Sequence, residues 1–408
     1  MNHAPSLTSP VTLPPTRPHL AASLIALALA GFGLVIGLTY CAALEKRAIH
    51  ALAPEFSDEK LQGAALQKEA FRQPDLLVMY GSSELAKEMP NNAVQFFEDY
   101  PTGFCVFPVG KPGTTSLAIL QKLAAVGSDA RGRKLAYSIS PGWFFTEDWD
   151  PIYYEGNFSD MQAMELVFSS DLSRGLRHDV ARRMIEYPRT ADDSWVLDFS
   201  AHRLAGDTLG DRVAYNVIWP LGKLQCAIGR MQDHFSAALY ILDEDEKLDS
   251  PARRSSRGLN WNVILRKAAR FANKAAVRAK QNEVALRHGQ KSGRPMAIQR
   301  GLAQGEEWTD FELLLRTCQE LGANPLFLSM PIEDIRLEVY GLGDDARRLY
   351  VERLRSLTDE FQFPLLLFQD HESDLDFLVD FQDHLSGEGW LYYNKALDDF
   401  YHGRISSL

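Results

Sequence analysis

An uncharged run of 25 residues, from Leu20 to Leu44, constrains this chain more than any other feature of its sequence. As a helix it would be about 37 Å long, which exceeds the roughly 30 Å hydrocarbon core of a bilayer. A cleaved signal peptide would have a shorter apolar region behind a compact basic start, whereas a proline-rich stretch precedes this run. We therefore predict an N-terminal tail over residues 1–19 and an uncleaved transmembrane anchor over residues 20–44.

The charges beside this run do not decide on which side of the membrane the rest of the chain lies. Arg17 precedes the run, and Lys46 and Arg47 follow it. Hydrophobic residues make up 46% and charged residues 24% of the 408 residues, so we expect the part after the anchor to fold in water. The net charge of −11 argues against nucleic acid as a partner.

Short apolar runs alternate with helical patterns after Pro74. Continuous apolar strands that are separated by helices are typical of a parallel sheet with helices on both faces. We predict a three-layer α/β/α domain over residues 74–408, preceded by a juxtamembrane helix or linker over residues 45–73. The expected strands are residues 75–80, 104–109, 134–139, 325–329 and 364–368.

Strand patterns largely disappear between about residues 150 and 300, where we predict a mainly helical insertion in the α/β domain. Residues 251–300 contain thirteen Lys and Arg residues and one acid, Glu283, and so have a net charge of +12. This segment is either a solvated basic helix or a surface for an anionic headgroup or polymer.

Two adjacent serines follow the first predicted strand, in the sequence Gly81-Ser82-Ser83. A serine on the turn between a buried parallel strand and a helix lies at the carboxyl edge of the sheet, with helix amides beside its hydroxyl. Ser83 is therefore the candidate nucleophile, although the spacing does not separate it from Ser82. A serine here could also be only a helix N-cap.

A serine nucleophile needs a base and a carboxylate that orients this base. Among ten histidines, His384 is the best candidate, because it lies in a turn-rich segment between the last strand and a terminal helix. Asp380 and Asp383 are the candidate acids. This segment could instead only cap the helix, and His371 is a second candidate base.

The loop after the second predicted strand, residues 109–116, contains Gly113, whose amide could approach a developing negative charge. The loop lacks the spacing of a phosphate-binding loop, and the sequence has no HExxH motif and no CxxC pair. We therefore expect neither a metal nor a nucleotide or other cofactor.

Together, these segments resemble the D-alanyl-lipoteichoic acid biosynthesis protein DltD family, a membrane-anchored group of SGNH hydrolase-like proteins. The resemblance covers most of residues 20–402 and depends on the anchor together with five motifs. These are Gly81-Ser-Ser-Glu-Leu85, Ser140-Pro-Gly-Trp-Phe144, Asn157-Phe-Ser-Asp-Met-Gln162, Ser329-Met-Pro331 and His384-Leu-Ser-Gly-Glu-Gly-Trp390.

The resemblance implies an extracytoplasmic α/β/α domain, held at the cell membrane by one anchor, that acts on D-alanyl esters of an anionic envelope polymer. This polymer would be teichoic acid-like or a lipopolysaccharide. The implied partners are a membrane-bound O-acyltransferase and a D-alanyl carrier system. Ser83 matches the nucleophile, His384 the general base and Gly113 the oxyanion glycine, and we place Ser82 and Trp143 with the oxyanion and substrate-binding residues.

The sequence departs from the family pattern at two positions. The family usually has Asp three residues before the histidine, where Phe381 stands here. We favour Asp380 over Asp383 as the acid, because an immediately adjacent residue often points away from its neighbour. Gly142 stands where the family often has a polar residue, which leaves the acceptor open. The alternative functions are an O-acetyl esterase or acetyltransferase of an exopolysaccharide, and a non-catalytic partner of the acyltransferase.

Overall fold

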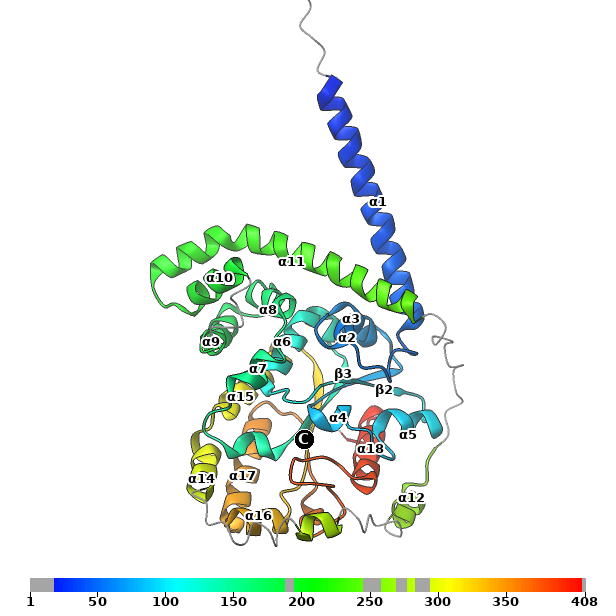
Figure 1. Ribbon diagram of the computed structural model, residues 1–408, viewed down its shortest axis with the longest axis vertical. Coiled ribbons are helices and arrows are strands. Elements are labelled where there is room, and N and C mark those ends of the chain that lie inside the picture. The colour runs from blue at the N-terminus through cyan, green and yellow to red at the C-terminus, as the bar shows by residue number, and fades with distance from the viewer. Residues whose placement is uncertain (1–17, 188–193, 245–257, 269–276, 283–293, 406–408) are drawn as a thin grey trace, which may run out of the picture.

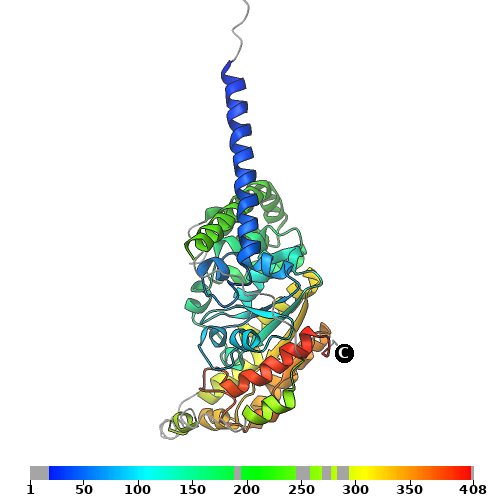
Figure 2. The same cartoon turned by 90° about the vertical axis from the view of Figure 1, so that its right-hand side faces the viewer.

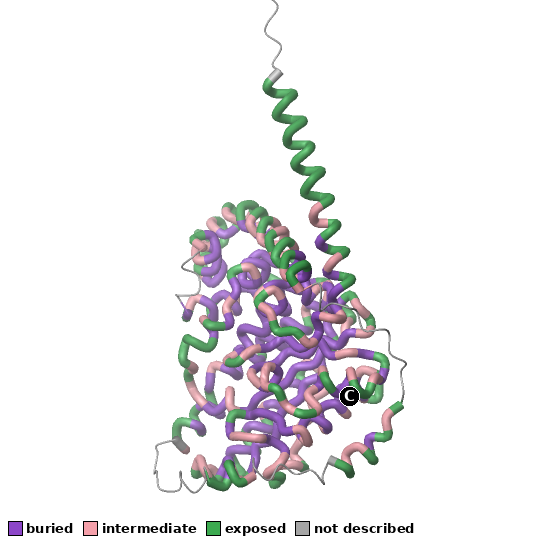
Figure 3. The backbone as a smooth tube through the Cα atoms, turned by 45° about the vertical axis from the view of Figure 1, so that its right-hand side comes forward, coloured by how far each residue is buried: buried purple, intermediate pink, exposed green. Residues whose placement is uncertain are grey.

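The computed structural model describes residues 18–187, 194–244, 258–268, 277–282 and 294–405. The chain begins with a long helix, α1 (Pro18–Ala48), that projects from the rest of the molecule (Figure 1). Its segment His19–Ala48 is long and apolar enough to cross a membrane by length and composition. Most of α1 is exposed (Figure 3), and its last turns enter the domain, where Cys41, Glu45 and Ala48 are buried.

Five parallel strands form one sheet in the order β2-β1-β3-β4-β5. They are β1 (Leu76–Tyr80), β2 (Cys105–Val109), β3 (Lys134–Ile139), β4 (Asn324–Ser329) and β5 (Leu365–Leu367). Each predicted strand is confirmed to within one residue at either end. The chain runs from β1 to β2 on one side and then returns to β3 on the other, so the strand order switches at β1. In open parallel sheets, such a switch point is where the carboxyl ends of strands form a crevice.

Helices cover both faces of the sheet. Leu76, Val78 and Tyr80 of β1 enter one apolar core, whereas Leu77 and Met79 enter the other, and all five are buried. The first core is covered by α3 (Ala65–Arg72), α6 (Ser116–Val126), α15 (Glu306–Leu321) and α17 (Asp344–Glu360). The second is covered by α5 (Ala93–Asp99), α12 (Trp261–Ala268) and α18 (Gly387–Tyr401). The predicted three-layer arrangement is therefore confirmed.

The described part of residues 150–300 contains helices and no strand, as predicted. These helices include α7 (Pro151–Glu155), α8 (Asp160–Val167), α9 (Arg174–Met184), α10 (Trp195–Ala205), α11 (Leu209–Asp243), α12 and α14 (Arg294–Gln304), and residues 277–282 are also helical. The longest, α11, crosses the end of the domain from which α1 emerges (Figures 1 and 2). The remaining helices are short: α2 (Asp58–Leu61), α4 (Ser83–Ala86), α16 (Asp334–Tyr340) and the 3-10 helices Gly127–Ala130, Pro141–Phe145 and Gln369–His371.

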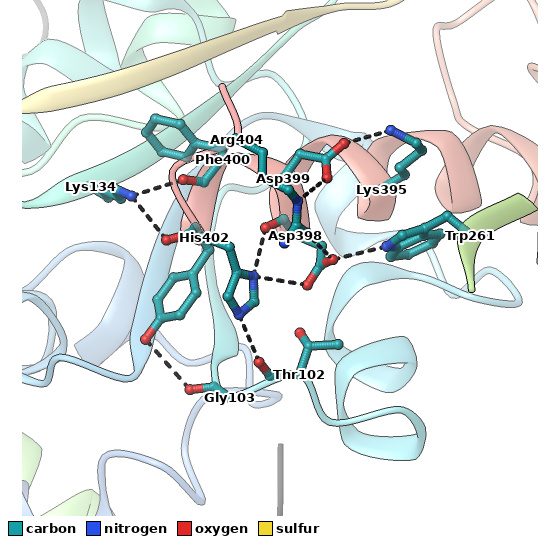
Figure 4. Close-up of polar contacts among 11 residues, drawn as sticks. Thr102, Gly103, Lys134, Trp261, Lys395, Asp398, Asp399, Phe400, His402 and Arg404 are labelled. Atoms are coloured by element: carbon teal, nitrogen blue, oxygen red, sulfur yellow. Dashed lines mark hydrogen bonds and ion pairs between the residues drawn. The ribbon is translucent and has the colours of Figure 1, made fainter. Parts of the chain in front are cut away.

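The last helix, α18, runs antiparallel to the strands, and polar contacts fix its end at the amino-terminal edge of the sheet (Figure 4). Lys134, the first residue of β3, donates to the carbonyl oxygen of Phe400 over 2.9 Å. The ring of His402 contacts the carbonyl oxygen of Thr102, just before β2, at 3.0 Å. The first turn of α18 therefore lies toward the carboxyl edge, and His384, three residues before this helix, is brought to that edge.

Candidate active site

The turn after β1 carries both candidate serines, and the structure distinguishes them. Ser82 is buried, and its Oγ makes no hydrogen bond within the described residues. Its backbone amide donates to the Glu84 carboxylate over 3.0 Å, and burial raises the pKa of Glu84 to about 6. Ser83 is half-buried, and its Oγ lies 2.9 Å from Nε2 of His384. Ser83 is therefore the serine that faces the candidate base.

The loops after β1 and β2 contact each other, and Gly110 lets their backbones approach. The amide of Gly81 donates to the carbonyl oxygen of Val109 over 3.3 Å. A Cβ atom on Gly110 would overlap the backbone of Gly81. Gly113, further along this loop, has a φ of +84°, in the left-handed region that favours glycine. The topology thus places Gly113 at the edge of the sheet that also carries the Ser83 turn.

Asn157 holds this loop in place. The hydroxyl of Thr114 donates to Oδ1 of Asn157 over 2.8 Å, and Nδ2 of Asn157 donates to the carbonyl oxygens of Pro112 (3.3 Å) and Tyr153 (2.9 Å). The side chain is buried, so these bonds are shielded from water. Sequence reasoning included Asn157 in a family motif without assigning it a role, which only the folded contacts reveal.

Ser83, His384 and Asp380 form a continuous chain of hydrogen bonds. Nε2 of His384 faces the serine, and Nδ1 lies 2.7 Å from Oδ2 of Asp380. Burial alone would raise the pKa of Asp380, but hydrogen bonds from His384 and Lys87 hold it well below its ordinary value. Asp380 is therefore ionised over the whole physiological range. Serine, histidine and carboxylate stand in the order in which a nucleophile, its base and the orienting acid act in serine hydrolases.

Asp383 makes a different set of contacts, although it precedes His384 directly. It has a φ of +61°, and its buried carboxylate forms an ion pair with Arg336. The same carboxylate accepts hydrogen bonds from the amide of Gly142 (2.7 Å) and from the hydroxyl of Ser140 (2.8 Å). Asp383 thus holds the loop after β3. No sequence pattern could have identified Arg336 as its partner, because this residue lies on a separate helix, α16.

Lys87 is a charged neighbour that sequence reasoning missed. Its Nζ lies 2.7 Å from Oδ2 of Asp380 and 3.1 Å from Nδ1 of His384. An ammonium group only donates, so Nδ1 could accept from it only when unprotonated, whereas the carboxylate can accept from both groups. When Nδ1 of His384 carries the proton, both this group and the Lys87 ammonium donate to the Asp380 carboxylate. Nε2 is then unprotonated and can accept from Ser83. No sequence pattern predicts these contacts, because Lys87 and the segment that carries Asp380 and His384 meet only in the fold.

Trp143 lies in the 3-10 helix after β3 and belongs to an aromatic cluster. The ring centroids of Trp149 and Tyr153 stand 4.4 and 5.3 Å from that of Trp143. Tyr153 is also the ring that a Cβ atom on Gly113 would contact. The cluster therefore borders the loop that carries Gly113.

His371, the second candidate base, contacts Asp374 at 2.6 Å and is not the histidine beside Ser83. The segment that contains His384 also caps the last helix, and the capping residue is Ser386. Its Oγ accepts from two backbone amides of the first turn. His384 is thus left to face Ser83.

A cavity of about 640 Å³ lies beside this segment, between α5, α12 and the start of α18. It is lined mainly by apolar side chains, including Met89, Phe96, Ile264 and Leu391, and neither Ser83 nor His384 lines it. In the part of the chain that the structure describes, no three His, Cys, Asp or Glu side chains are grouped so that they could hold a metal ion.

The fold and this site define an α/β/α protein that carries a Ser–His–Asp arrangement at the carboxyl edge of a parallel sheet. The model of the DltD protein family matches residues 53–402, and the chain therefore belongs to the DltD family. The resemblance drawn from the motifs is thus confirmed for the family.

Named relatives cover most of the chain. It is 24% identical over 367 residues to Protein DltD of Bacillus subtilis (strain 168), across 87% of this chain and 90% of that protein. It is 19% identical over 348 residues to Protein DltD of Staphylococcus aureus (strain NCTC 8325 / PS 47), across 84% and 85%. With Protein DltD of Lacticaseibacillus rhamnosus, it shares 20% identity over 365 residues, across 86% and 83%.

Proposed function

We propose that this protein is a membrane-anchored serine acyltransferase or acyl esterase that acts in D-alanylation of an anionic cell-envelope polymer. The observation that carries the proposal is the chain of contacts from Ser83 through His384 to Asp380, at 2.9 and 2.7 Å. Membership of the DltD family supports the choice of D-alanyl esters as substrates. The polymer would be teichoic acid-like or a lipopolysaccharide.

In this mechanism His384 takes the proton of Ser83 while Oγ attacks the acyl carbonyl carbon. Asp380 stabilises the resulting imidazolium, and the amides of Ser83 and Gly113 donate to the oxyanion. The leaving alcohol takes the proton from His384 as the ester bond breaks, which leaves the acyl group on Ser83. Water or a glycan hydroxyl then attacks this ester, gives its proton to His384 and receives the acyl group, and the proton returns to Ser83. Ser82 and Trp143 would contribute to substrate binding.

The proposed location is the outer face of the cell membrane, with α1 as a single-pass anchor. A membrane-bound O-acyltransferase and a D-alanyl carrier system would supply the acyl group. Alkaline phosphatase fused after Leu408 tests this topology, because the enzyme becomes active only outside the cytoplasm. An inactive fusion that is produced in normal amounts would contradict it.

The central experiment complements a strain that lacks the gene with the wild type, Ser83→Ala or His384→Ala. Mild base then releases ester-linked D-alanine from the envelope for quantification. We expect loss of this ester in both variants at matched expression. His202→Ala, which alters an exposed histidine on α10, is the control and should behave like the wild type. Full D-alanylation in both active-site variants would contradict the catalytic proposal.

The same strains separate the alternative functions. Loss of acetate instead of D-alanine from the envelope would point to an O-acetyl esterase or acetyltransferase of an exopolysaccharide. A non-catalytic partner of the acyltransferase would tolerate Ser83→Ala but not charge reversal at Arg266 and Lys267, which lie at the end of α12.

The structure describes only part of the basic segment 251–300. In that part, Lys280 is buried against Glu333 and Arg300 pairs with Glu147, so these two cations are neutralised within the fold. Several other cations of this segment, among them Arg270, lie outside the described residues.

A further inference from the structure

An exposed apolar stripe runs along the whole of α11. With 3.6 residues per turn, its members fall within one arc of about 120°, and no charged residue of the helix shares that arc. A helix of 35 residues is about 50 Å long, so the stripe spans a large part of the molecule. Its members are Leu209, Val213, Val217, Leu221, Leu224, Ile228, Phe235, Leu239 and Leu242.

The stripe adjoins the helix that is proposed to span the membrane. His234 of α11 contacts Glu45 of α1 at 2.7 Å, and the side chain of Glu45 is only 1% exposed. One residue further on, the ring of Phe235 lies 3.4 Å from where a Cβ atom on Gly37 would be. Gly37 belongs to the uncharged run, so Phe235 reaches the level at which α1 would enter the bilayer. Both views show α11 across the end of the domain from which α1 emerges (Figures 1 and 2).

The other side of α11 is held against the domain. Tyr215 and Cys226 are buried there. Near the end of the helix, the carboxylate of Asp233 accepts hydrogen bonds from the amides of Ala64 (2.9 Å) and Ala65 (2.7 Å), where α3 begins. The helix therefore cannot rotate about its axis to bury the stripe, and the stripe stays exposed unless something outside the domain covers it.

We propose that α11 lies in the plane of the membrane interface, with its apolar stripe inserted at the boundary between lipid headgroups and acyl chains. A long exposed apolar surface marks an interaction site, and an apolar stripe on an otherwise polar helix is typical of a helix that lies on a bilayer. Three cations follow one border of the stripe. Arg212 is exposed and would meet anionic headgroups there. The other two are held by the domain, since Lys223 donates to a backbone carbonyl oxygen and Arg230 forms an ion pair with Glu165.

This proposal extends the anchoring that belongs to the proposed function, and it adds a constraint that α1 alone cannot supply. A single spanning helix leaves the domain free to rotate about the membrane normal and to tilt. A second contact, about 50 Å long and fixed to the first through His234 and Phe235, removes the tilt. The site at the carboxyl edge of the sheet would then stand at a constant height above the lipid.

The test measures the depth of spin labels in the full chain, reconstituted in vesicles of phosphatidylethanolamine and phosphatidylglycerol. Labels are attached to Val217→Cys and Leu239→Cys in the stripe, to Ile25→Cys in α1, and to Ser236→Cys, an exposed position of α11 outside the stripe. Oxygen reports contact with lipid and a nickel chelate reports contact with water. The wild-type chain, in which three cysteines are buried and Cys105 is half-buried, gives the background.

We expect the ratio of oxygen to nickel accessibility at Val217→Cys and Leu239→Cys to exceed that at Ser236→Cys by at least about threefold and to approach that at Ile25→Cys. Equal ratios at all three positions of α11 would overturn the proposal. Protection from both reagents would also overturn it, because a protein, such as a second copy of the chain, would then cover the stripe.

The result is independent of the catalytic part of the proposed function. If Ser83→Ala is inactive and the labels on α11 contact lipid, both proposals are supported. If D-alanylation is unchanged in Ser83→Ala and the labels contact lipid, the catalytic proposal is contradicted and the contact of α11 with the membrane is still supported. A label at Ile25→Cys that contacts only water would show that α1 does not span the bilayer, and would overturn the anchor and the contact of α11 together.

Discussion

The carboxyl edge of the sheet and the outer face of α11 differ in which kinds of side chain they bury and which they expose. At the sheet edge, charged side chains are partly or fully buried and paired, as in Lys87 with Asp380 and Arg336 with Asp383. On the outer face of α11, large apolar side chains are exposed, with Val217 at 76%. Burying charges costs stability unless they are paired, and exposing apolar surface costs stability unless something covers it. The charges at the sheet edge meet this condition, because they are paired. In the described part of the chain nothing covers the outer face of α11, and its proposed contact with lipid would remove that cost.

The largest effect should come from Asp380→Asn, which keeps the shape of the side chain but removes its charge. Asparagine can no longer favour the proton on Nδ1 or stabilise the imidazolium, so we expect ester turnover to fall by roughly 10²–10⁴-fold. Turnover of a water-soluble D-alanyl ester by the purified full chain measures this. The melting temperature and the depth of α11 should stay unchanged, and a loss in either would mean that Asp380 has a structural role instead.

Asp383→Ala should show the converse behaviour, with its main effect on stability. The substitution leaves the buried Arg336 without its partner carboxylate, which typically costs about 3–5 kcal/mol in the free energy of unfolding. Chemical denaturation measures this loss. The double variant Asp383→Ala, Arg336→Met should recover part of it, because the unpaired charge is then gone. A fully stable but inactive single variant would instead place Asp383 in the chemistry.

The positions of the strands could be predicted from the sequence. So could the proximity of the Ser83 turn and the His384 segment at one edge of the sheet. Buried parallel strands are continuous apolar runs, and their carboxyl ends share one edge, which brings the turn of Ser83 near the segment of His384. The choice between Asp380 and Asp383 depends on the left-handed backbone of Asp383, and the role of Lys87 depends on two loops that meet only in the fold. Neither fact follows from the spacing of residues in the sequence.

The apolar stripe of α11 is a different case, because its spacing of three and four residues is visible in the sequence. What the sequence does not give is which side of a helix faces the domain. A stripe of this kind is usually the buried face of an amphipathic helix. Here Tyr215 and Cys226 form the buried face, and the stripe points outward.

Glu307, a buried acid in the first turn of α15, provides a test of how stability depends on pH. Its carboxylate accepts from the amide of Ser116, and burial, with a contribution from Asp310, raises the pKa of Glu307 to about 8. The folded state therefore keeps a proton that the unfolded state loses, so the free energy of unfolding falls as pH rises from 4.5 towards 8.

Glu307→Gln keeps the acceptor and removes this titration. We expect the variant to be more stable than the wild type by on the order of 1–3 kcal/mol at pH 8, and equally stable near pH 4.5. Thermal unfolding at both values of pH measures the difference. An equal gain at both would attribute the effect to packing.

On the α11 side, Val217→Glu combined with Leu239→Glu should weaken only reactions that depend on the membrane. Two charges in the stripe oppose insertion, so turnover of an acyl ester carried on a vesicle lipid should fall by roughly three- to tenfold. Turnover of the water-soluble ester should not change, because neither residue contacts the sheet edge. Ser236→Glu is the matched control. An equal loss with both substrates would indicate a general defect in folding.

The smallest effect should come from Lys87→Met, which removes the second donor to Asp380. The side chain of Lys87 is 36% exposed, and a pair this exposed contributes about 0–1 kcal/mol, so the maximal rate should change by less than about fivefold. Turnover of the water-soluble ester by the purified full chain measures this change. Lys87→Arg keeps the charge and a donor to Asp380 and should retain the wild-type rate. An equal change in both variants would show that Lys87 acts through shape and not through charge.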